Sequence, residues 1–435
     1  MTTELARNRT VNTTDKTTDK TTDKTIGKTT DKNTENVVHY NSFDDMEDFL
    51  DFKLMKGIFE YGFQSPSQIQ NLTIKHIHDG YDIIAQSQSG TGKTGAFTIG
   101  ALSTIDTTMN YPQIIILATT RELATQIHFV VSNISKHMDI KIELAIGGTK
   151  IINDVNKDPY KHIRNSHVII GTPGRIHDYI QRKAFNPKKL KMFVMDEADA
   201  LLKDDFVEQI QKIFNELDKK CQIVIFSATY TDNILQIAES ITSEPKKKIL
   251  MKHEELSVKL IKQYKIDVVK DNIKYSTLQD LYTKLQIGQC IIFVNSINTA
   301  NYLENKLTAD GCAVSKIHGE LETEKRNSVL RDFRLGITRV LIATDVLSRG
   351  IDIEQIGIVI NYDLPRDYAQ YLHRIGRSGR FGKIGVAINF VTNNDHQTLS
   401  NIEEHYKIKI IDMPNPTTIN NFLSGVGGHM KLNTN

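Results

Sequence analysis

The sequence predicts two doubly wound α/β domains in tandem, joined by a short linker. The chain has 435 residues, more than a single hydrophobic core usually serves. Short β-branched runs alternate with helical patterns over residues 37–243, and the same alternation returns over residues 263–423. Apolar strands separated by helices are typical of a parallel sheet with helices on both faces. Between the two regions, residues 244–262 contain a proline and a lysine cluster, which indicates a linker.

The expected strands are the most apolar runs of the chain. In the first domain they cover residues 82–85, 113–117, 167–170, 192–195 and 222–226. In the second domain they cover residues 289–294, 339–343, 357–360 and 385–390. Ligands of doubly wound sheets bind beyond the carboxyl ends of the strands, so the polar motifs that follow these runs are candidate sites.

The two ends of the chain lack this alternation. Residues 1–36 contain repeats of Thr-Thr-Asp-Lys and offer almost no apolar surface, which predicts a disordered tail. A partner-binding or modified segment is the alternative interpretation. Residues 424–435 are expected to form a second flexible tail.

Composition and charge exclude some classes of protein. Hydrophobic residues make up 39% of the chain and charged residues 24%, as in globular proteins, and no apolar run reaches the length of a membrane span. No secretory signal is recognisable, so we expect a cytoplasmic protein. The three cysteines form no Cys-x-x-Cys pair and are expected to be free thiols. A net charge of +2 does not by itself indicate nucleic-acid binding.

A glycine-rich segment follows the first expected strand. It consists of Ser89, Gly90, Thr91, Gly92, Lys93 and Thr94. Glycines let backbone N–H groups approach a polyphosphate closely, and the helix that follows directs its positive end at the anion. The lysine is expected to contact the β and γ phosphates of a nucleoside triphosphate, and Thr94 to bind Mg²⁺. An ordinary glycine-rich turn is the alternative for the segment taken alone.

An acidic motif about a hundred residues later supports the nucleotide site. Asp196 and Glu197 follow the strand expected at residues 192–195. In this position Asp196 is expected to hold the metal ion, and Glu197 to orient or deprotonate the attacking water. Acidic runs usually coat solvated helices, but the order of the two motifs, each after an apolar run, predicts a nucleoside triphosphatase.

The second domain has no glycine-rich phosphate loop, but it has a basic segment. Residues 373–380 read His-Arg-Ile-Gly-Arg-Ser-Gly-Arg and place Arg377 and Arg380 three residues apart. A guanidinium at the γ phosphate would stabilise the charge of the transition state from across the cleft between the domains. A basic surface loop or a plain RNA contact is the alternative.

With these motifs the chain resembles the DEAD-box RNA helicases from about Phe43 to Phe422. The matching motifs lie at residues 62–70, 89–94, 120–124, 147–148, 172–175, 196–199 and 227–229, and at 293–295, 318–319, 344–352 and 373–380. The resemblance implies two RecA-like domains that couple RNA-stimulated ATP hydrolysis to local unwinding of short RNA duplexes, in translation initiation or mRNA metabolism. An ATP-dependent RNA clamp with suppressed turnover is the alternative function. The implied partners of this expected monomer are RNA, bound with little sequence preference, and a protein scaffold.

The resemblance also implies how the nucleoside is bound. Gln70 would read the adenine edge, with Phe43 and Phe63 as the aromatic side chains at the base. The spacing between these two phenylalanines differs from that of the family, so Phe49 or Phe52 is an alternative stacking ring. For Gln70 alone, a helix-capping amide is the alternative. Further along the chain, Asp352 would contact the ribose.

Two more groups of residues follow from the resemblance. Ser227 and Thr229 would hydrogen-bond the acidic motif and link hydrolysis to strand separation. The residues that would hold the RNA backbone are Arg121, Gly148, Thr172, Gly174, Arg175, Asn295, Arg326 and Thr344. Such backbone contacts predict sequence-tolerant, salt-sensitive binding.

The chain departs from the family's usual residues at three positions. Thr119 stands where the family usually has proline, Thr323 where it has glutamine, and Ser348 where it has alanine. None of these changes removes a predicted catalytic group. The shorter side chain of Thr323 is expected to weaken a contact with RNA.

Overall fold

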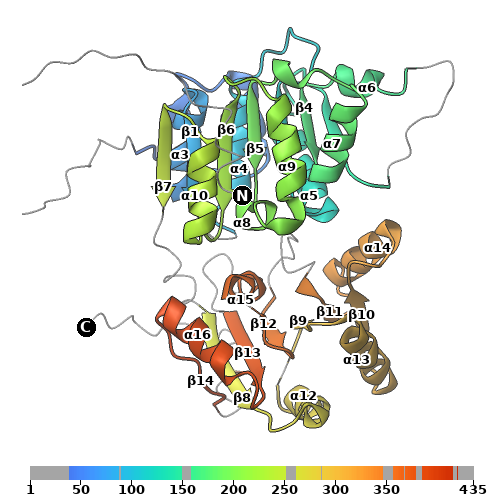
Figure 1. Cartoon of the computed structure of the whole chain (residues 1–435). Helices are drawn as coiled ribbons and strands as arrows, with labels where there is room; N and C mark the ends of the chain where they lie inside the picture. Colours follow the sequence, from blue (N-terminus) through green and yellow to red (C-terminus); the bar gives the residue numbers. More distant parts are fainter. Residues whose placement is uncertain are drawn as a thin grey trace, which may run out of the picture.

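The chain forms two α/β lobes, one above the other in Figure 1. This computed structural model describes residues 39–87, 90–148, 158–250, 261–285, 287–345, 356–366, 368–378, 385–414 and 419. The predicted tails, residues 1–36 and 424–435, lie outside these ranges. The predicted fold class is confirmed, because each lobe contains a parallel sheet with helices on both faces.

The first lobe is built on a seven-stranded sheet whose order is β3-β4-β2-β5-β6-β1-β7. The strands are β1 (Asp82–Gln86), β2 (Ile114–Leu117), β3 (Ile142–Ala145), β4 (Val168–Gly171), β5 (Met192–Met195), β6 (Gln222–Ser227) and β7 (Lys246–Leu250). The α-helices are α2 (Phe52–Glu60), α3 (Gln68–His78), α4 (Lys93–Leu102), α5 (Arg121–Ile134), α6 (Lys161–Arg164), α7 (Pro173–Gln181), α8 (Ala198–Leu201), α9 (Asp204–Glu216) and α10 (Asp232–Ile241). Short 3₁₀ helices lie at η1 (Asp44–Met46) and η2 (Pro187–Lys189).

The second lobe repeats this topology, with the sheet order β10-β11-β9-β12-β13-β8-β14. Its strands are β8 (Ile261–Asp267), β9 (Cys290–Phe293), β10 (Val314–Ile317), β11 (Val340–Ala343), β12 (Ile358–Asn361), β13 (Gly385–Val391) and β14 (Ile411–Asp412). Its helices are η3 (Asp271–Ile273), α12 (Lys274–Lys284), α13 (Ile297–Ala309), α14 (Thr323–Arg334), α15 (Tyr368–Ile375) and α16 (His396–Tyr406).

The continuous apolar runs form strands that are buried on both faces. In β2, Ile114 and Ile116 pack into the core on the side of helices α2 to α5, whereas Ile115 and Leu117 pack into the core on the side of α7 to α10. Successive side chains of a strand point to opposite faces, so a sheet covered on both sides needs an apolar residue at every position. This explains why the strands are visible in the sequence as unbroken apolar runs.

The boundary between the lobes differs from the predicted linker, residues 244–262. Lys246–Leu250 forms β7, an edge strand that pairs in parallel with β1. At the other end, β8 begins at Ile261 and pairs with β13. The edge strand β7 is rich in lysine, which is common on exposed edge strands and masks the strand pattern in the sequence. The connection between the sheets is therefore shorter, and residues 251–260 lie outside the described ranges.

Two chemical properties agree with the composition. Cys221, Cys290 and Cys312 are free thiols. Among the described helices, none combines the length and the apolar character that a membrane crossing requires.

Candidate active site

The glycine-rich segment connects β1 to α4 at the carboxyl edge of the first sheet. Gly90 and Gly92 have positive φ angles of 82° and 96°, a conformation that glycine adopts without strain. A Cβ atom on Gly92 would lie 2.8 Å from Gln70 Nε2, so this position also needs glycine for close packing. Helix α4 begins at Lys93, directly after the second glycine. Ser89, the first predicted residue of the loop, lies outside the described ranges.

Lys93 lies inside this loop with only 8% of its surface exposed. Its Nζ atom donates a hydrogen bond to the carbonyl oxygen of Ser87 at 2.5 Å. The hydroxyl of Ser87 in turn lies 2.6 Å from that of Thr91, on the same loop. Burial lowers the pKa of Lys93, and nearby Asp196 is the largest influence that raises it. Among the described residues the one hydrogen-bond partner of this buried ammonium is a neutral carbonyl, so the ammonium is suited to bind an anion.

The Gln70 amide lies between α3 and the phosphate loop. Its Oε1 accepts a hydrogen bond from Ser67 N at 2.8 Å, and its Nε2 donates one to Gly92 O at 3.2 Å. Ser67 and Gln70 form a capping box at the start of α3. The side chain thus caps the helix and also connects it to the phosphate loop. Reading of adenine by this amide stays a prediction.

The aromatic candidates differ in their surroundings. Phe43 is completely buried, between the rings of Phe59 and Phe63. Phe63 is half-buried, and a Cβ atom on Gly95 of α4 would lie 2.8 Å from its ring. Phe49 packs against the core and against His78. In this arrangement Phe43 presents no ring surface to a base, whereas Phe63 adjoins the helix that follows the phosphate loop.

Phe52, the other alternative, is 73% exposed at the start of α2. Among the described residues Phe52 makes no aromatic ring contact. Phe63 is therefore the aromatic side chain best placed near Gln70.

The acidic motif begins directly after β5. Asp196 is 3% exposed, and burial raises the pKa of its carboxyl to about 7, although Lys93 opposes this shift. Glu197 follows with a left-handed backbone (φ 54°), and its N–H donates to Asp196 Oδ1 at 2.9 Å. Adjacent carboxyl groups with so little solvent favour binding of a cation.

The last residue of the motif, Asp199, connects three segments. Its carboxylate accepts hydrogen bonds from the hydroxyls of Ser227 at 2.8 Å and Thr229 at 3.1 Å. His373 Nε2, from α15 of the second lobe, lies 3.0 Å from the same carboxylate. The side chains of Asp199 and His373 are each 1% exposed. Neither residue had a predicted role, although both lie within motifs that are recognisable in the sequence.

Arg377 follows α15 and is 3% exposed. Its Nε donates to the carbonyl oxygen of His373 at 3.3 Å. Its positive charge is one of the influences that lower the pKa of Lys93, after burial, so the charge acts across the boundary between the lobes. Arg380 and Asp352 lie outside the described ranges.

The predicted RNA contacts of the first lobe follow β2, β3 and β4. Arg121 begins α5, and a Cβ atom on Gly147 would lie 2.6 Å from its Nη2. Gly148 has a φ of 90°. Thr172 precedes α7, and Gly174 is exposed in its first turn.

Arg175, on the next position of α7, donates from Nε to the carbonyl oxygen of Ile146 at 3.1 Å. Its guanidinium also lies over the Tyr179 ring, 5.6 Å from the centroid. These contacts hold the arginine at the same sheet edge as the other predicted RNA residues. The predicted set therefore gathers at one half of the edge, and the phosphate loop and acidic motif lie at the other half.

In the second lobe the predicted RNA residues follow β9, β10 and β11, the corresponding half of the second sheet. Asn295 donates to the carbonyl oxygen of Leu364 at 2.8 Å, and Thr344 is 8% exposed after β11. Arg374, which the sequence analysis left without a role, is completely buried and donates to Asn295 Oδ1 at 2.7 Å and to Asp345 Oδ1 at 2.6 Å. Arg374 thus fixes the orientation of the Asn295 amide.

Arg326 has an unexpected partner. Its Nη1 donates to Glu122 Oε1 of the first lobe at 2.8 Å, and its Nε to the carbonyl oxygen of Leu321 at 2.9 Å. The side chains of Arg326 and Glu122 are 10% and 5% exposed. The predicted RNA-binding arginine therefore forms a buried ion pair between the lobes. The position of Glu122 beside Arg121 was visible in the sequence, but its partner was not.

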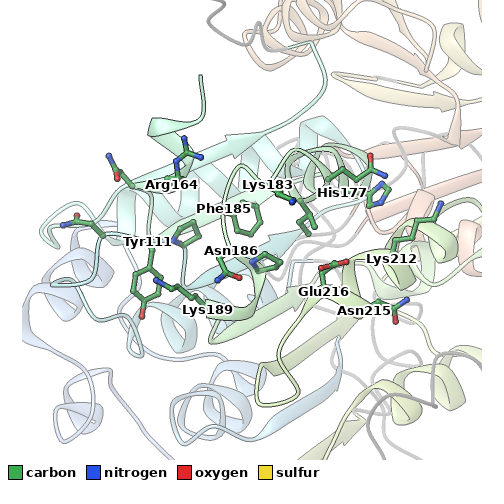
Figure 2. A pocket seen from close by; sticks show the side chains of 16 residues that line it. Tyr111, Arg164, His177, Lys183, Phe185, Asn186, Lys189, Lys212, Asn215 and Glu216 are labelled. Atoms are coloured by element: carbon green, nitrogen blue, oxygen red, sulfur yellow. The ribbon is translucent and has the colours of Figure 1, made fainter. Parts of the chain in front are cut away.

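A cavity of about 960 Å³ lies at the opposite edge of the first sheet, before the starts of β2, β4 and β5. Figure 2 shows Tyr111, Arg164, Lys183 and Lys189 among the side chains that line it. None of the predicted site residues lines this cavity. The motifs described above thus lie together, away from it.

Comparison with known proteins identifies the family. Residues 67–237 match the DEAD/DEAH box helicase family, and residues 273–382 match the helicase conserved C-terminal domain. The ATP-dependent RNA helicase eIF4A of Saccharomyces cerevisiae is 45% identical over 86% of this chain and 92% of its own length. The ATP-dependent RNA helicase FAL1 of Kluyveromyces lactis is 46% identical over 83% of this chain and 90% of its own length.

The structure of S. cerevisiae Dbp5 bound to RNA and ADP BeF3 superimposes on both lobes with a TM-score of 0.81, at 38% identity. The superposition covers 88% of this chain and 100% of that one. Both matched domains, the identity over most of the chain and the shared two-lobe fold agree with the motifs. The chain therefore belongs to the DEAD/DEAH box helicase family.

Proposed function

We propose that this protein is an ATP-dependent RNA helicase that couples RNA-stimulated ATP hydrolysis to local unwinding of short RNA duplexes. The main support is the composite nucleotide site, in which Arg377 follows the helix whose His373 lies 3.0 Å from Asp199, while Lys93 belongs to the first lobe. Neither lobe alone contains both groups. The similarity to eIF4A supports a role in translation initiation or mRNA metabolism.

ATP would bind with its phosphates in the loop between β1 and α4. Gly90, Thr91 and Gly92 would direct backbone N–H groups at the phosphates, with Ser89 next to them in the sequence, and Lys93 would exchange the carbonyl of Ser87 for the β and γ phosphates. This exchange is favourable because an ammonium interacts more strongly with phosphate than with a neutral carbonyl.

Thr94 and Asp196 would hold Mg²⁺, which neutralises phosphate charge when bound. A hydroxyl and a buried carboxylate are suitable oxygen ligands. Burial raises the pKa of Asp196, and a bound cation would lower it again. Among the described residues no cluster of three or more His, Cys, Asp or Glu side chains could hold a metal ion. The proposed ion would therefore take its other ligands from ATP and water.

Glu197 would orient and deprotonate the water that attacks the γ phosphate. Arg377 and Arg380 would stabilise the negative charge of the transition state, which is worth about 10³ to 10⁵ in rate for such arginines. Because both arginines belong to the second lobe, hydrolysis would require the two lobes to lie against each other with ATP between them. This chain superimposes on Dbp5 bound to RNA and ADP BeF3 with a TM-score of 0.81 over 88% of its length.

The base would lie beside Gln70, whose amide offers a donor and an acceptor to adenine. Phe63 is the better placed stacking ring, with Phe43 behind it in the core. Asp352 would contact the ribose. Because the Gln70 amide already bonds Gly92, binding of adenine and the conformation of the phosphate loop would be coupled.

RNA would lie along the other half of both sheet edges. The residues proposed to hold its backbone are Arg121, Gly148, Thr172, Gly174, Arg175, Asn295, Arg326 and Thr344. Contacts to phosphate and the 2′-hydroxyl carry no base information, so binding would tolerate sequence but distinguish RNA from DNA. A groove formed by both lobes and shaped for a bent strand would separate a short duplex.

The link between the two ligands would be Asp199, which contacts Ser227 and Thr229 within its lobe and His373 across the boundary. By thermodynamic reciprocity, RNA must tighten ATP binding by the same factor by which ATP tightens RNA binding. We further propose a monomer that a protein scaffold directs to its RNA. The expected cytoplasmic location stays a prediction.

ATP hydrolysis by the full chain, measured with no nucleic acid, with single-stranded RNA and with DNA of equal length, tests the proposal. We expect RNA, but not DNA, to stimulate ATP hydrolysis. The apparent affinity for RNA should fall as the salt concentration rises. Equal stimulation by DNA would contradict the choice of RNA, and hydrolysis that no polynucleotide changes would contradict the coupling.

Unwinding of a short RNA duplex separates the helicase from the clamp. A helicase releases strands over many cycles of ATP hydrolysis. An RNA clamp would instead retain labelled RNA in the presence of ATP without turnover. Stable retention with no strand release would therefore replace the helicase proposal by the clamp.

A further inference from the structure

The register of the first sheet brings Thr119 beside Glu197. Leu117 of β2 pairs with Met195 of β5, and both strands end at these residues. Thr119 lies two residues beyond the end of β2, and Glu197 lies two residues beyond the end of β5. Asp196 N also donates to Leu117 O at 3.1 Å, which keeps the two segments adjacent beyond the strand ends.

The two side chains form a buried hydrogen bond. Thr119 Oγ1 donates to Glu197 Oε2 at 3.0 Å. Thr119 is 9% exposed and Glu197 is 7% exposed. Within the described ranges, no other side chain has a recorded hydrogen bond to this carboxylate. A hydrogen bond to an ionised group that is shielded from water is stronger than a neutral one.

Proline, the usual residue of the family at position 119, cannot make this contact. Its ring has no hydroxyl, and it restricts the backbone before α5 instead. Threonine leaves the backbone freer but supplies a donor. The next residue, Thr120, is occupied separately as the N-cap of α5, where its hydroxyl accepts from Leu123 N at 3.1 Å. The donor to Glu197 is thus a feature of this chain.

We propose that Thr119 is a positioning residue for ATP hydrolysis, which holds Glu197 Oε2 so that Oε1 faces the attacking water. The inference rests on the proposed function. In the step that it serves, a proton passes from water to Glu197 and the water oxygen bonds the γ phosphorus. The bond from that phosphorus to the β–γ bridging oxygen breaks, and ADP leaves with the electron pair. Thr119 gains and loses no atoms.

The separation of kcat from KM tests the proposal. Thr119→Val keeps the shape and removes the donor, so kcat for RNA-stimulated ATP hydrolysis should fall about tenfold, part of the effect of a general base. The KM for ATP and the Kd for a non-hydrolysable ATP analogue should change less than about twofold, because the hydrogen bond does not involve the bound phosphates. Thr119→Ser, which restores the donor, should recover most of kcat.

Thr125→Val is a matched control on α5, because the Thr125 side chain is exposed and donates only to the carbonyl oxygen of Arg121 at 2.8 Å. This variant should retain the kcat of the wild type. If Thr119→Val matches the wild type in kcat, or if Thr119→Ser is as slow as Thr119→Val, the positioning role is wrong. If Thr119→Val and Thr119→Ser instead lost stability in general, their Tm would fall and their affinity for the ATP analogue would decrease.

A double-mutant cycle asks whether Thr119 acts through Glu197. In a Glu197→Gln background, single-turnover hydrolysis should be slow and should not fall further when Thr119→Val is added. A further tenfold fall would mean that Thr119 acts by another route. If the wild type shows no RNA-stimulated hydrolysis, the proposed function itself fails, a result distinct from failure of the Thr119 inference.

Discussion

The two lobes share one topology, but a lysine at the same position of each lobe has different partners. Each sheet has the same strand order, and the helix that follows the first strand of each lobe begins with a lysine, Lys93 in α4 and Lys274 in α12. Both lysines are buried, 8% and 5% exposed. Only the first follows a glycine-rich loop.

The difference lies in what neutralises each charge. Lys274 Nζ lies 2.8 Å from Asp271 Oδ1 and 2.8 Å from Asp363 Oδ1. Burial alone would lower its pKa, but these hydrogen bonds raise it above the usual value of 10.5. The pKa of Lys93 is lowered by burial. The carboxylates of the second lobe thus pair with Lys274, whereas Lys93 donates to a neutral carbonyl oxygen.

The largest effect is expected from the cation that the second lobe provides. Arg377→Ala should lower RNA-stimulated ATP turnover by about 10³, because arginines at a γ phosphate contribute at least that much. The affinity for ATP in the absence of RNA should change little. Steady-state hydrolysis at saturating RNA measures this, with the exposed Arg366→Ala as the matched arginine control. Turnover equal to that of the wild type would show that Arg377 does not act on ATP, and it would contradict the composite nucleotide site.

The direct comparison of the two lysines gives the next effect. Lys93→Ala should lower kcat/KM for ATP by about 10², as loss of one charge-stabilising donor does. Lys274→Met should leave kcat/KM within about twofold, because its partners belong to its own lobe. If both variants lose turnover equally, the distinction between the two lysines is wrong.

The ion pair between the lobes is expected to have a smaller effect. Glu122→Gln should weaken RNA binding in the presence of an ATP analogue about tenfold, because the buried Arg326 loses its charged partner. Arg326→Met should weaken RNA binding further and reduce its salt dependence, because Arg326 is also proposed to hold the RNA backbone, and the double variant should be no worse than Arg326→Met. If Arg326→Met has only the effect of Glu122→Gln and leaves the salt dependence unchanged, Arg326 does not contact RNA phosphate directly.

The smallest effect concerns stability at alkaline pH. Because the folded pKa of Lys274 is raised, its contribution to stability is complete below the unfolded value of 10.5 and is lost as pH rises through the folded pKa. The wild type should exceed Lys274→Met in Tm by about 3 °C near neutral pH. This difference should shrink above about pH 10.5. Thermal unfolding across pH 8 to 11 checks it, and a constant difference would indicate that packing rather than charge holds Lys274.

Features that depend on short stretches of chain could be predicted from the residues alone. Apolar runs predicted the central strands of both sheets, because strands buried on both faces need apolar residues at each position, whereas β3, β8, β10 and β14, which contain polar residues, were not predicted. The phosphate loop and the acidic motif were also recognisable, since their chemistry needs fixed residue types at fixed spacing after a strand. The edge strand at Lys246–Leu250 was missed because its lysines carry no apolar pattern.

Contacts between side chains that are far apart in the sequence could not be predicted in this way. The burial of Phe43, the ion pair of Arg326 with Glu122 and the hydrogen bond of Thr119 to Glu197 depend on strand register and on how the lobes pack. A one-residue change of register would separate Thr119 from Glu197 without altering either motif. Local sequence specifies the groups that perform the chemistry, and packing selects their partners.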